Sequence, residues 1–241
     1  MISSFKSQRT AAFPKGCPAY QEIGNTAYVT FDEFTVPDKS LDYYKTPATA
    51  DATDTLGIIQ YAHSQITRKG SPVKNVVLDL SCNGGGDSSA AMYVLGWFLG
   101  SATLNINSTI TNAQASTQYK IDTNMDRAFD DSDTLQGRGL NLYCLASPAS
   151  FSCGNLVPVT FKSSGKVKLL GEQTGGGACA VLPLSTADGT MFQISGYRRL
   201  STVVNGSFID VDKGAAPDFA IAKQENFYNR KALTKYINSL F

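Results

Sequence analysis

The chain has 241 residues, of which 42% are hydrophobic and 17% are charged, and its formal net charge at pH 7 is +1. This length and composition favour one globular domain, or one domain with a small appendage. Charges of both signs are spread along the chain, which excludes the basic stripe of a nucleic-acid binder and the polybasic run of an anionic-membrane binder. No stretch approaches the ~20 apolar residues that span a bilayer, and the polar opening of the chain predicts no signal peptide.

The N-terminal part of the chain predicts an arm, a strand and a helix. Residues 1–25 show few apolar residues in any period, and we expect an irregular N-terminal arm, or the remnant of a preceding region, before a core domain at 26–241. The alternating sequence at 27–34 predicts a first strand. Residues 51–69 carry apolar side chains at helical spacing, and the only histidine, His63, lies on this apolar face.

The rest of the chain alternates strand-like and helical patterns. In order these are a strand at 76–80, a helix at 89–99, strands at 102–122, an acidic polar loop at 123–138, a strand at 140–146, a helix from about 152 to 161, a strand at 167–171, turn-rich strands at 180–211 and a helix at 224–240. Strands that alternate with helices predict an α/β fold with parallel pairings. Three loops, Asn83–Gly86, Ser150–Gly154 and Thr174–Gly177, follow such strands. Because sites in these sheets gather at the carboxyl ends of the strands, we expect the three loops to converge.

Ser152 stands at a predicted strand-to-helix turn. Such a turn exposes a hydroxyl, and the helix N-terminus adds a positive dipole and a free backbone N–H, as a serine nucleophile requires. The alternative is a helix N-cap serine without chemistry.

The glycine run Gly84–Gly86 allows backbone N–H groups to face an anionic oxygen. It predicts one half of an oxyanion hole, with the Cys153 N–H as the other half. The alternatives are an ordinary tight turn or a phosphate loop, although neither standard phosphate motif is present.

Four segments occur in an order that one enzyme family shares. Val77–Gly86 is similar to its D-L-R-x-N-x-G-G segment, Ser150–Asn155 to its S-A-S-A-S-E segment, Leu170–Gly176 to its V-G-E-x-T-x-G segment and Lys213–Asp218 to its closing G-V-x-P-D turn. The chain therefore resembles the C-terminal-processing (tail-specific) serine peptidase family. This family includes the tricorn protease core and the retinoid-binding repeats of the photoreceptor matrix.

The resemblance implies an α/β fold with a Clp-protease/crotonase-like core of ββα units. It implies a serine peptidase that acts on a polypeptide substrate, uses no cofactor or metal, and is exported or placed in the cell envelope. Ser152 matches the nucleophile position, and the amides of Gly84 or Gly85 and of Cys153 match the oxyanion donors. The third segment implies substrate binding by the turn residues Thr174, Gly175 and Gly176.

The chain departs from the family at every standard general base. Gly177 stands where the processing proteases have a lysine, and Thr30 stands where the tricorn-like branch has a histidine. That branch also has a glutamate where this chain has Val211, and Asn155 replaces the glutamate that follows the nucleophile.

A base therefore has to be non-standard. Asp212 is one candidate, the alternative being a solvated turn carboxylate, and Lys168 is another if its strand turns it inward. His63 is expected to be a core histidine with one local hydrogen bond rather than a base.

Cys82, Cys153 and Cys179 each adjoin one of the three converging loops. Four interpretations remain open for them: a disulfide such as Cys153–Cys179, a thiol nucleophile at Cys153, zinc ligation by the three thiolates, or small buried residues that fill tight turns.

Three functions compete. The first is an active serine hydrolase with a non-standard base, and the second is an inactive family member that binds peptides or hydrophobic ligands in the same cleft. The third is a crotonase-like acyl-CoA enzyme, which would share the oxyanion amides but not the nucleophile segment.

Overall fold

The computed structural model describes residues 2–38, 40–223 and 225–240. Its centre is a six-stranded sheet in which the first pair of strands is antiparallel and the other pairs are parallel. In spatial order the strands are β1 (Tyr20–Ile23), β2 (Thr26–Thr30), β3 (Asn75–Asp79), β6 (Asn141–Ala146), β7 (Lys168–Gly171) and β11 (Phe219–Ala220). The parallel pairings confirm the predicted α/β fold, and they place the ends of β3, β6 and β7 at one edge of the sheet.

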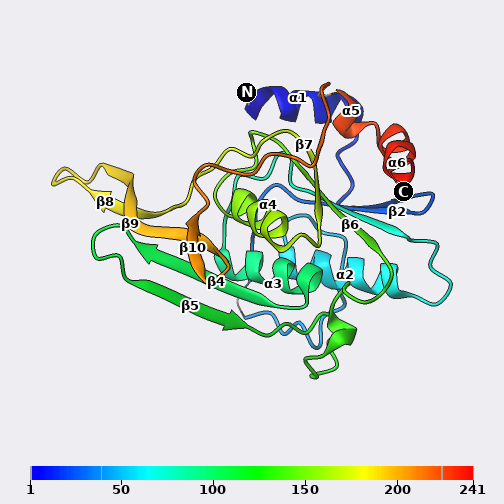
Figure 1. Cartoon of the computed structure of the whole chain (residues 1–241), viewed down its shortest axis with the longest axis horizontal. Helices are drawn as coiled ribbons and strands as arrows, with labels where there is room; N and C mark the ends of the chain where they lie inside the picture. Colours follow the sequence, from blue (N-terminus) through cyan, green and yellow to red (C-terminus); the bar gives the residue numbers. More distant parts are fainter. Residues whose placement is uncertain (1, 39, 224, 241) are drawn as a thin grey trace.

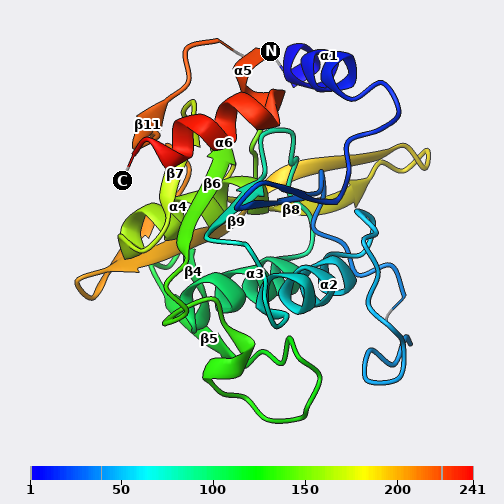
Figure 2. The same cartoon turned by 90° about the vertical axis from the view of Figure 1, so that its right-hand side faces the viewer.

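Helices cover both faces of this sheet (Figures 1 and 2). One face packs on α2 (Thr55–Thr67), α3 (Ser88–Leu99) and α4 (Cys153–Ser164), and the other packs on α1 (Ile2–Ala12), α5 (Glu225–Tyr228) and α6 (Arg230–Asn238). The alternation of β3 explains the two layers, since Val76 and Leu78 enter the first core cluster while Val77 enters the second. Both faces of the sheet are therefore buried.

A second, antiparallel sheet lies beside this sandwich. It contains β4 (Ala102–Ser108), β5 (Gln114–Tyr119), β9 (Met191–Val204) and β10 (Ser207–Asp210) in the order β10-β9-β4-β5, and β8 (Cys179–Ser185) pairs with β9. The β8–β9 hairpin projects from the body of the protein on the left of Figure 1. These strands agree with the predicted strand-rich segments at 102–122 and 180–211.

The N-terminal segment differs from the expected irregular arm, because most of it forms α1 and β1. Phe5 is fully buried, with its ring edge-on to Phe227 at a centroid distance of 5.3 Å. Arg9 forms an ion pair with Asp32. The helix has no apolar stripe at helical spacing, so the periodicity of the sequence does not predict it. Tertiary contacts of two side chains stabilise it instead.

The C-terminal helix is also different in detail. The predicted span at 224–240 is two helices, α5 and α6, and Gln224 lies outside the described residues. They meet at Asn229, whose side chain accepts a hydrogen bond from the Ala232 N–H at 3.1 Å and so begins α6.

The packing of α1 gives a stability prediction. Phe5→Ala should lower the free energy of unfolding by about 3–5 kcal/mol, because it empties a fully buried site. Lys6→Ala, at the exposed neighbouring position, should change it by no more than about 0.5 kcal/mol. Urea unfolding followed by circular dichroism measures both, and equal stability of the two variants would contradict a structural role for α1.

Candidate active site

Ser152 adopts a backbone conformation that is rare for a residue with a side chain. Its φ is +55° and its ψ is −123°, immediately before the first residue of α4. It occupies the N-cap position of α4, but its side chain makes no capping hydrogen bond to the helix, unlike the usual N-cap serine. Strained conformations of this kind cluster at functional sites, where the surrounding structure has to hold them.

Two glycine turns hold the Ser152 loop from opposite sides. The Phe151 N–H donates to the Asn83 carbonyl at 3.0 Å, and the Ser152 N–H donates to the Gly176 carbonyl at 2.9 Å. A Cβ on Gly85 would lie 2.6 Å from the Ser152 Cβ, so only glycine fits there. The three loops therefore converge as the sequence predicts.

Asn83 has an organising role that the sequence argument missed. Its side-chain amide donates to the Phe31 carbonyl at 3.1 Å, and its Oδ1 accepts the Gly85 N–H at 2.9 Å. One residue thus ties the glycine turn to the segment that directly follows β2 and, through its carbonyl, to Phe151. The signal was an asparagine directly before a glycine run, which is a typical position for a side chain that bonds the turn backbone.

The loop has other serines, and the structure distinguishes them from Ser152. The Ser150 hydroxyl is buried and donates to the Leu80 carbonyl at 2.7 Å, while the Ser147 hydroxyl donates to the Ser81 carbonyl at 2.5 Å. The Ser152 side chain is half-buried and forms no hydrogen bond with any described His, Lys, Asp or Glu side chain. Of these three serines, Ser152 is the one that is not fully buried and whose hydroxyl donates to no backbone carbonyl among the described residues.

The proposed oxyanion donors differ in availability. Within the described residues the Cys153 N–H donates to no other group, so it can face a substrate oxygen. The Gly84 N–H donates to the Asp32 carbonyl at 2.9 Å, and the Gly85 N–H is held by Asn83. Neither N–H is available to a substrate oxygen in this conformation, since each already donates to a group of the protein. The Gly86 N–H is the amide of this turn that has no acceptor among the described residues.

The turn residues assigned to substrate binding are used internally. The buried Thr174 hydroxyl donates to Asn155 Oδ1 at 2.6 Å and accepts the Ala215 N–H at 2.7 Å. The Gly175 N–H donates to the Ser150 carbonyl at 2.8 Å, and the Gly176 carbonyl accepts from Ser152. The Thr174 hydroxyl, the Gly175 N–H and the Gly176 carbonyl are thus used within the protein, and the assignment of these residues to substrate binding stays a prediction.

Asp212 holds the third turn. Its Oδ1 accepts the N–H groups of Gly177 at 3.2 Å and Ala178 at 3.0 Å, and the residue is exposed. It makes no hydrogen bond with Ser152, so its observed role is to hold the turn backbone, and its role as base stays a prediction.

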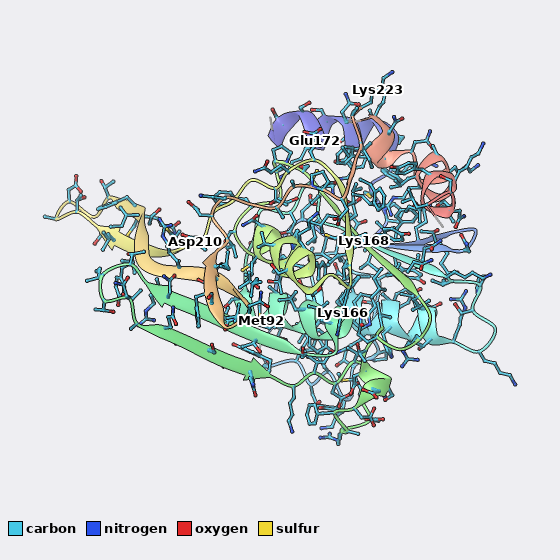
Figure 3. The ribbon with its side chains drawn as sticks, in the orientation of Figure 1. Met92, Lys166, Lys168, Glu172, Asp210 and Lys223 are labelled. Atoms are coloured by element: carbon cyan, nitrogen blue, oxygen red, sulfur yellow. The ribbon has the colours of Figure 1, made fainter. Side chains whose placement is uncertain are left out.

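The lysines of the neighbouring segment do not reach the site. Lys168 is the first residue of β7, at the end of the strand opposite the glycine turn, and it is exposed. The Lys166 ammonium donates to the Leu99 carbonyl at 3.2 Å. Figure 3 shows Lys166, Lys168 and Glu172 in succession along this segment, with Glu172 at the end where the site lies. The alternative of Lys168 as base is wrong because its strand does not turn it inward.

His63 is the core histidine that the sequence predicts. It is 3% exposed, and its Nδ1 accepts the Trp97 indole N–H at 3.0 Å. Burial, together with the charge of Arg138, lowers the pKa of His63 to about 4. It is therefore neutral at pH 7 and belongs to the α2–α3 contact.

The cysteines are free thiols in this structure. The Cys153–Cys179 disulfide, one of the four interpretations, is absent, and the described residues contain no group of three His, Cys, Asp or Glu side chains arranged to hold a metal. Burial, reinforced by the Asp87 carboxylate, raises the pKa of the Cys153 thiol to about 12. This increase exceeds the lowering expected from the helix N-terminus, so the thiol is protonated at neutral pH and is not a nucleophile. Cys82 and Cys153 are small buried side chains in tight turns.

Comparison with known proteins now identifies the family. A family model for peptidase family S41 matches residues 25–221. The chain belongs to peptidase family S41. No curated protein sequence matches it. This family membership confirms the resemblance seen in the sequence, and it supports a peptidase function.

Solved structures of S41 peptidases share its Clp-protease-like fold. A putative S41 protease from Bacteroides fragilis superposes with a TM-score of 0.61 at 16% identity, over 92% of this chain and 57% of the other. The photosystem II D1 C-terminal processing protease gives 0.58 at 20% identity, over 85% and 45%. The tricorn protease gives 0.53 at 15% identity, over 99% and 19%. At these identities the likeness concerns the fold, and the chain spans about half the length of the first two.

No helix in the described part of the chain has the length and apolar character needed to cross a membrane.

The buried neutral His63 predicts a pH dependence of stability. The unfolded chain binds a proton at His63 near pH 6.5, whereas the folded chain binds it only near pH 4, so stability falls as the pH drops between these values. From pH 6.5 to 5 this one group should cost roughly 2 kcal/mol. His63→Gln should lose less over the same interval, as measured by urea unfolding at each pH. Identical slopes for both proteins would contradict the assignment.

Proposed function

We propose that the chain is a serine-type peptidase with Ser152 as the nucleophile. The observation that carries this proposal is the positive φ of Ser152, which two glycine turns hold while the residue stays only half-buried. Inert serines at helix starts bond the helix backbone, and this one does not. The arrangement is that of a nucleophile on a strand-to-helix turn.

The acyl oxygen would be stabilised by backbone N–H groups. The Cys153 N–H lies directly after the nucleophile at the N-terminus of α4, and it has no other acceptor among the described residues. We assign the second donor to the Gly86 N–H instead of the Gly84 or Gly85 N–H, because those two are engaged in the turn.

The substrate would be a polypeptide, as the family implies. Exposed apolar side chains at Phe151 and on the hairpin that follows the third glycine turn support this assignment. The Phe151 side chain is 46% exposed and packs against the Gly177 backbone, where no Cβ would fit. The β8–β9 hairpin follows this turn and pairs Leu182 with Ile194 and Leu184 with Phe192, all four of them exposed. An extended apolar peptide fits such a surface.

The proton of the Ser152 hydroxyl has to leave when the oxygen attacks, and Asp212 is the candidate that the contacts favour. Its main-chain carbonyl lies against Gly176, whose own carbonyl binds the Ser152 N–H. Its Oδ1 is used by the turn, and its Oδ2 accepts no hydrogen bond from the described residues. A short rotation or a bridging water would connect this oxygen to Ser152.

One observation favours a second candidate function, a family member that binds peptides without cleaving them. No base lies at hydrogen-bonding distance from the Ser152 hydroxyl within the described residues, and the family's base positions hold Thr30, Val211 and Gly177. Thr30 and Val211 are buried, and Thr30 accepts from Arg230 at 2.8 Å.

Reaction with a fluorophosphonate probe tests the nucleophile. Wild-type protein should be labelled, and Ser152→Ala should lose at least about 100-fold of the labelling rate, because the attacking oxygen is gone. Ser164→Ala is the matched control, since this serine lies at the far end of α4 and should react as wild type does. Circular dichroism checks that each variant is folded. Absence of labelling in folded wild type supports the binding function, and labelling that persists in Ser152→Ala excludes this serine.

Asp212→Asn tests the base. The amide oxygen can still accept from Gly177 and Ala178, so the turn should survive while proton abstraction is lost. We expect the probe to react about 10²–10⁴-fold more slowly near neutral pH. Asp210→Asn, two residues away in the ion pair with Arg199, is the control for charge. Equal rates for Asp212→Asn and wild type would exclude Asp212 and leave the nucleophile assignment intact.

A further inference from the structure

The loop between β5 and β6 carries a pattern that the peptidase function does not use. Its twelve residues, 122–133, read Asp-Thr-Asn-Met-Asp-Arg-Ala-Phe-Asp-Asp-Ser-Asp. It lies below α2 and α3 at the bottom of Figure 1. Oxygen-bearing side chains occupy its positions 1, 3, 5, 9 and 12, namely Asp122, Asn124, Asp126, Asp130 and Asp133. These are the side-chain ligand positions of twelve-residue calcium loops.

The backbone of this loop turns where a calcium loop has to turn. Position 6 of such loops is a glycine that permits a sharp bend, and here Arg127 adopts a positive φ of 69° at that position. Its N–H donates to Asp122 Oδ2 at 2.8 Å, so the bend brings the chain back to the first ligand position. The guanidinium of Arg127, the one basic side chain of the twelve residues, lies over the Tyr44 ring at 4.0 Å. This cation–π contact engages its charge.

An independent observation points to a cation. Asp122 is only 4% exposed, and its Oδ1 is buried with no hydrogen-bond partner among the described residues. Its Oδ2 accepts from the Arg127 N–H within the loop and from the Tyr44 hydroxyl at 3.1 Å, so the carboxylate is held beside the bend and only Oδ1 is left for an ion. A buried carboxylate oxygen without a partner is costly, and a bound cation is the ordinary way to satisfy it.

We propose that this loop binds a calcium ion. The ligands would be Asp122, Asn124, Asp126, the carbonyl of Ala128 and Asp133, with Asp130 bound directly or through a water. Calcium fits better than magnesium because it accepts six to eight oxygen ligands in flexible geometry. Five carboxylates against one guanidinium in twelve residues favour a divalent cation.

The proposed ligands do not surround a common point in this structure, and the ion would bring them together. Among the described residues no three acidic side chains converge as metal ligands. Asp122 and Asp133 are buried, whereas Asn124, Asp126 and Asp130 are exposed and bond only within their own segment. Calcium binding would therefore turn the three exposed side chains toward the buried carboxylates of Asp122 and Asp133. Asp133 stands where such loops carry a longer, bidentate glutamate, so we expect weak binding, with a dissociation constant of roughly 10⁻⁴–10⁻³ M.

The site is connected to the core of the protein. The Tyr93 hydroxyl on α3 donates to the Asp122 carbonyl at 2.6 Å, and the Thr134 hydroxyl donates to the Trp97 carbonyl, also on α3, at 3.0 Å. Calcium bound to the folded loop alone would therefore stabilise the whole domain. This inference does not depend on the role of Ser152.

Two measurements on the full chain, freed of metal with EDTA and dialysed, test the site. Addition of 10 mM CaCl₂ should raise Tm by about 3–10 °C, and 10 mM MgCl₂ should raise it less. Terbium should bind with luminescence excited through tyrosine, because the Tyr44 hydroxyl touches Asp122, and calcium should displace it. Absence of a saturable calcium effect in both measurements would overturn the proposal.

Asp126→Asn removes one exposed ligand and should weaken calcium binding at least about tenfold, with a matching loss of the Tm shift. Asp131→Asn makes the same change of charge in the same loop at position 10, which supplies no ligand, and should respond as wild type does. Equal losses in the two variants would show that the loop attracts cations only by its net charge, and would overturn the assigned ligands.

Discussion

The site depends on one constraint, the two hydrogen bonds that fix the backbone of Phe151 and Ser152 between glycine turns from different parts of the chain. A positive φ at a residue with a Cβ costs about 1–3 kcal/mol, so it persists only where neighbouring structure imposes it. Here the neighbours are backbone groups, and the glycines at 85 and 176 let them approach closely. The parallel sheet supplies the alignment, because it ends three strands at one edge.

Neutral side chains form a hydrogen-bond network around the Ser152 loop. Asn155 receives a hydrogen bond from the Thr174 hydroxyl and donates to the Val211 carbonyl at 2.8 Å, so it joins α4, the third glycine turn and the segment after β10. All of its polar groups are satisfied and the residue is fully buried. This network of neutral side chains therefore orders the loops around Ser152.

A buried ion pair lies on the other side of the sheet end. Arg230 of α6 contacts Asp79, the last residue of β3, at 3.2 Å, and its guanidinium lies over the Tyr28 ring at 4.3 Å. Removal of either partner would leave a buried charge, so the pair fixes where α6 meets the sheet. Asp79 in turn accepts from the Ser81 hydroxyl at 2.6 Å, just before the first glycine turn. The C-terminal helices thereby support the turn that contacts Ser152.

The sequence by itself determined the α/β class, the family and the convergence of three loops, because strand periodicity, glycine runs and ordered motifs are local signals. It also predicts Ser152 as the nucleophile. It also identified His63 as a core residue from its place on an apolar helix face. Tertiary structure alone decided which amides are free and that Thr174 bonds within the protein, because hydrogen-bond partners distant in sequence leave no pattern. The same holds for α1, which is held by Phe5 and Arg9 through contacts with residues far along the chain.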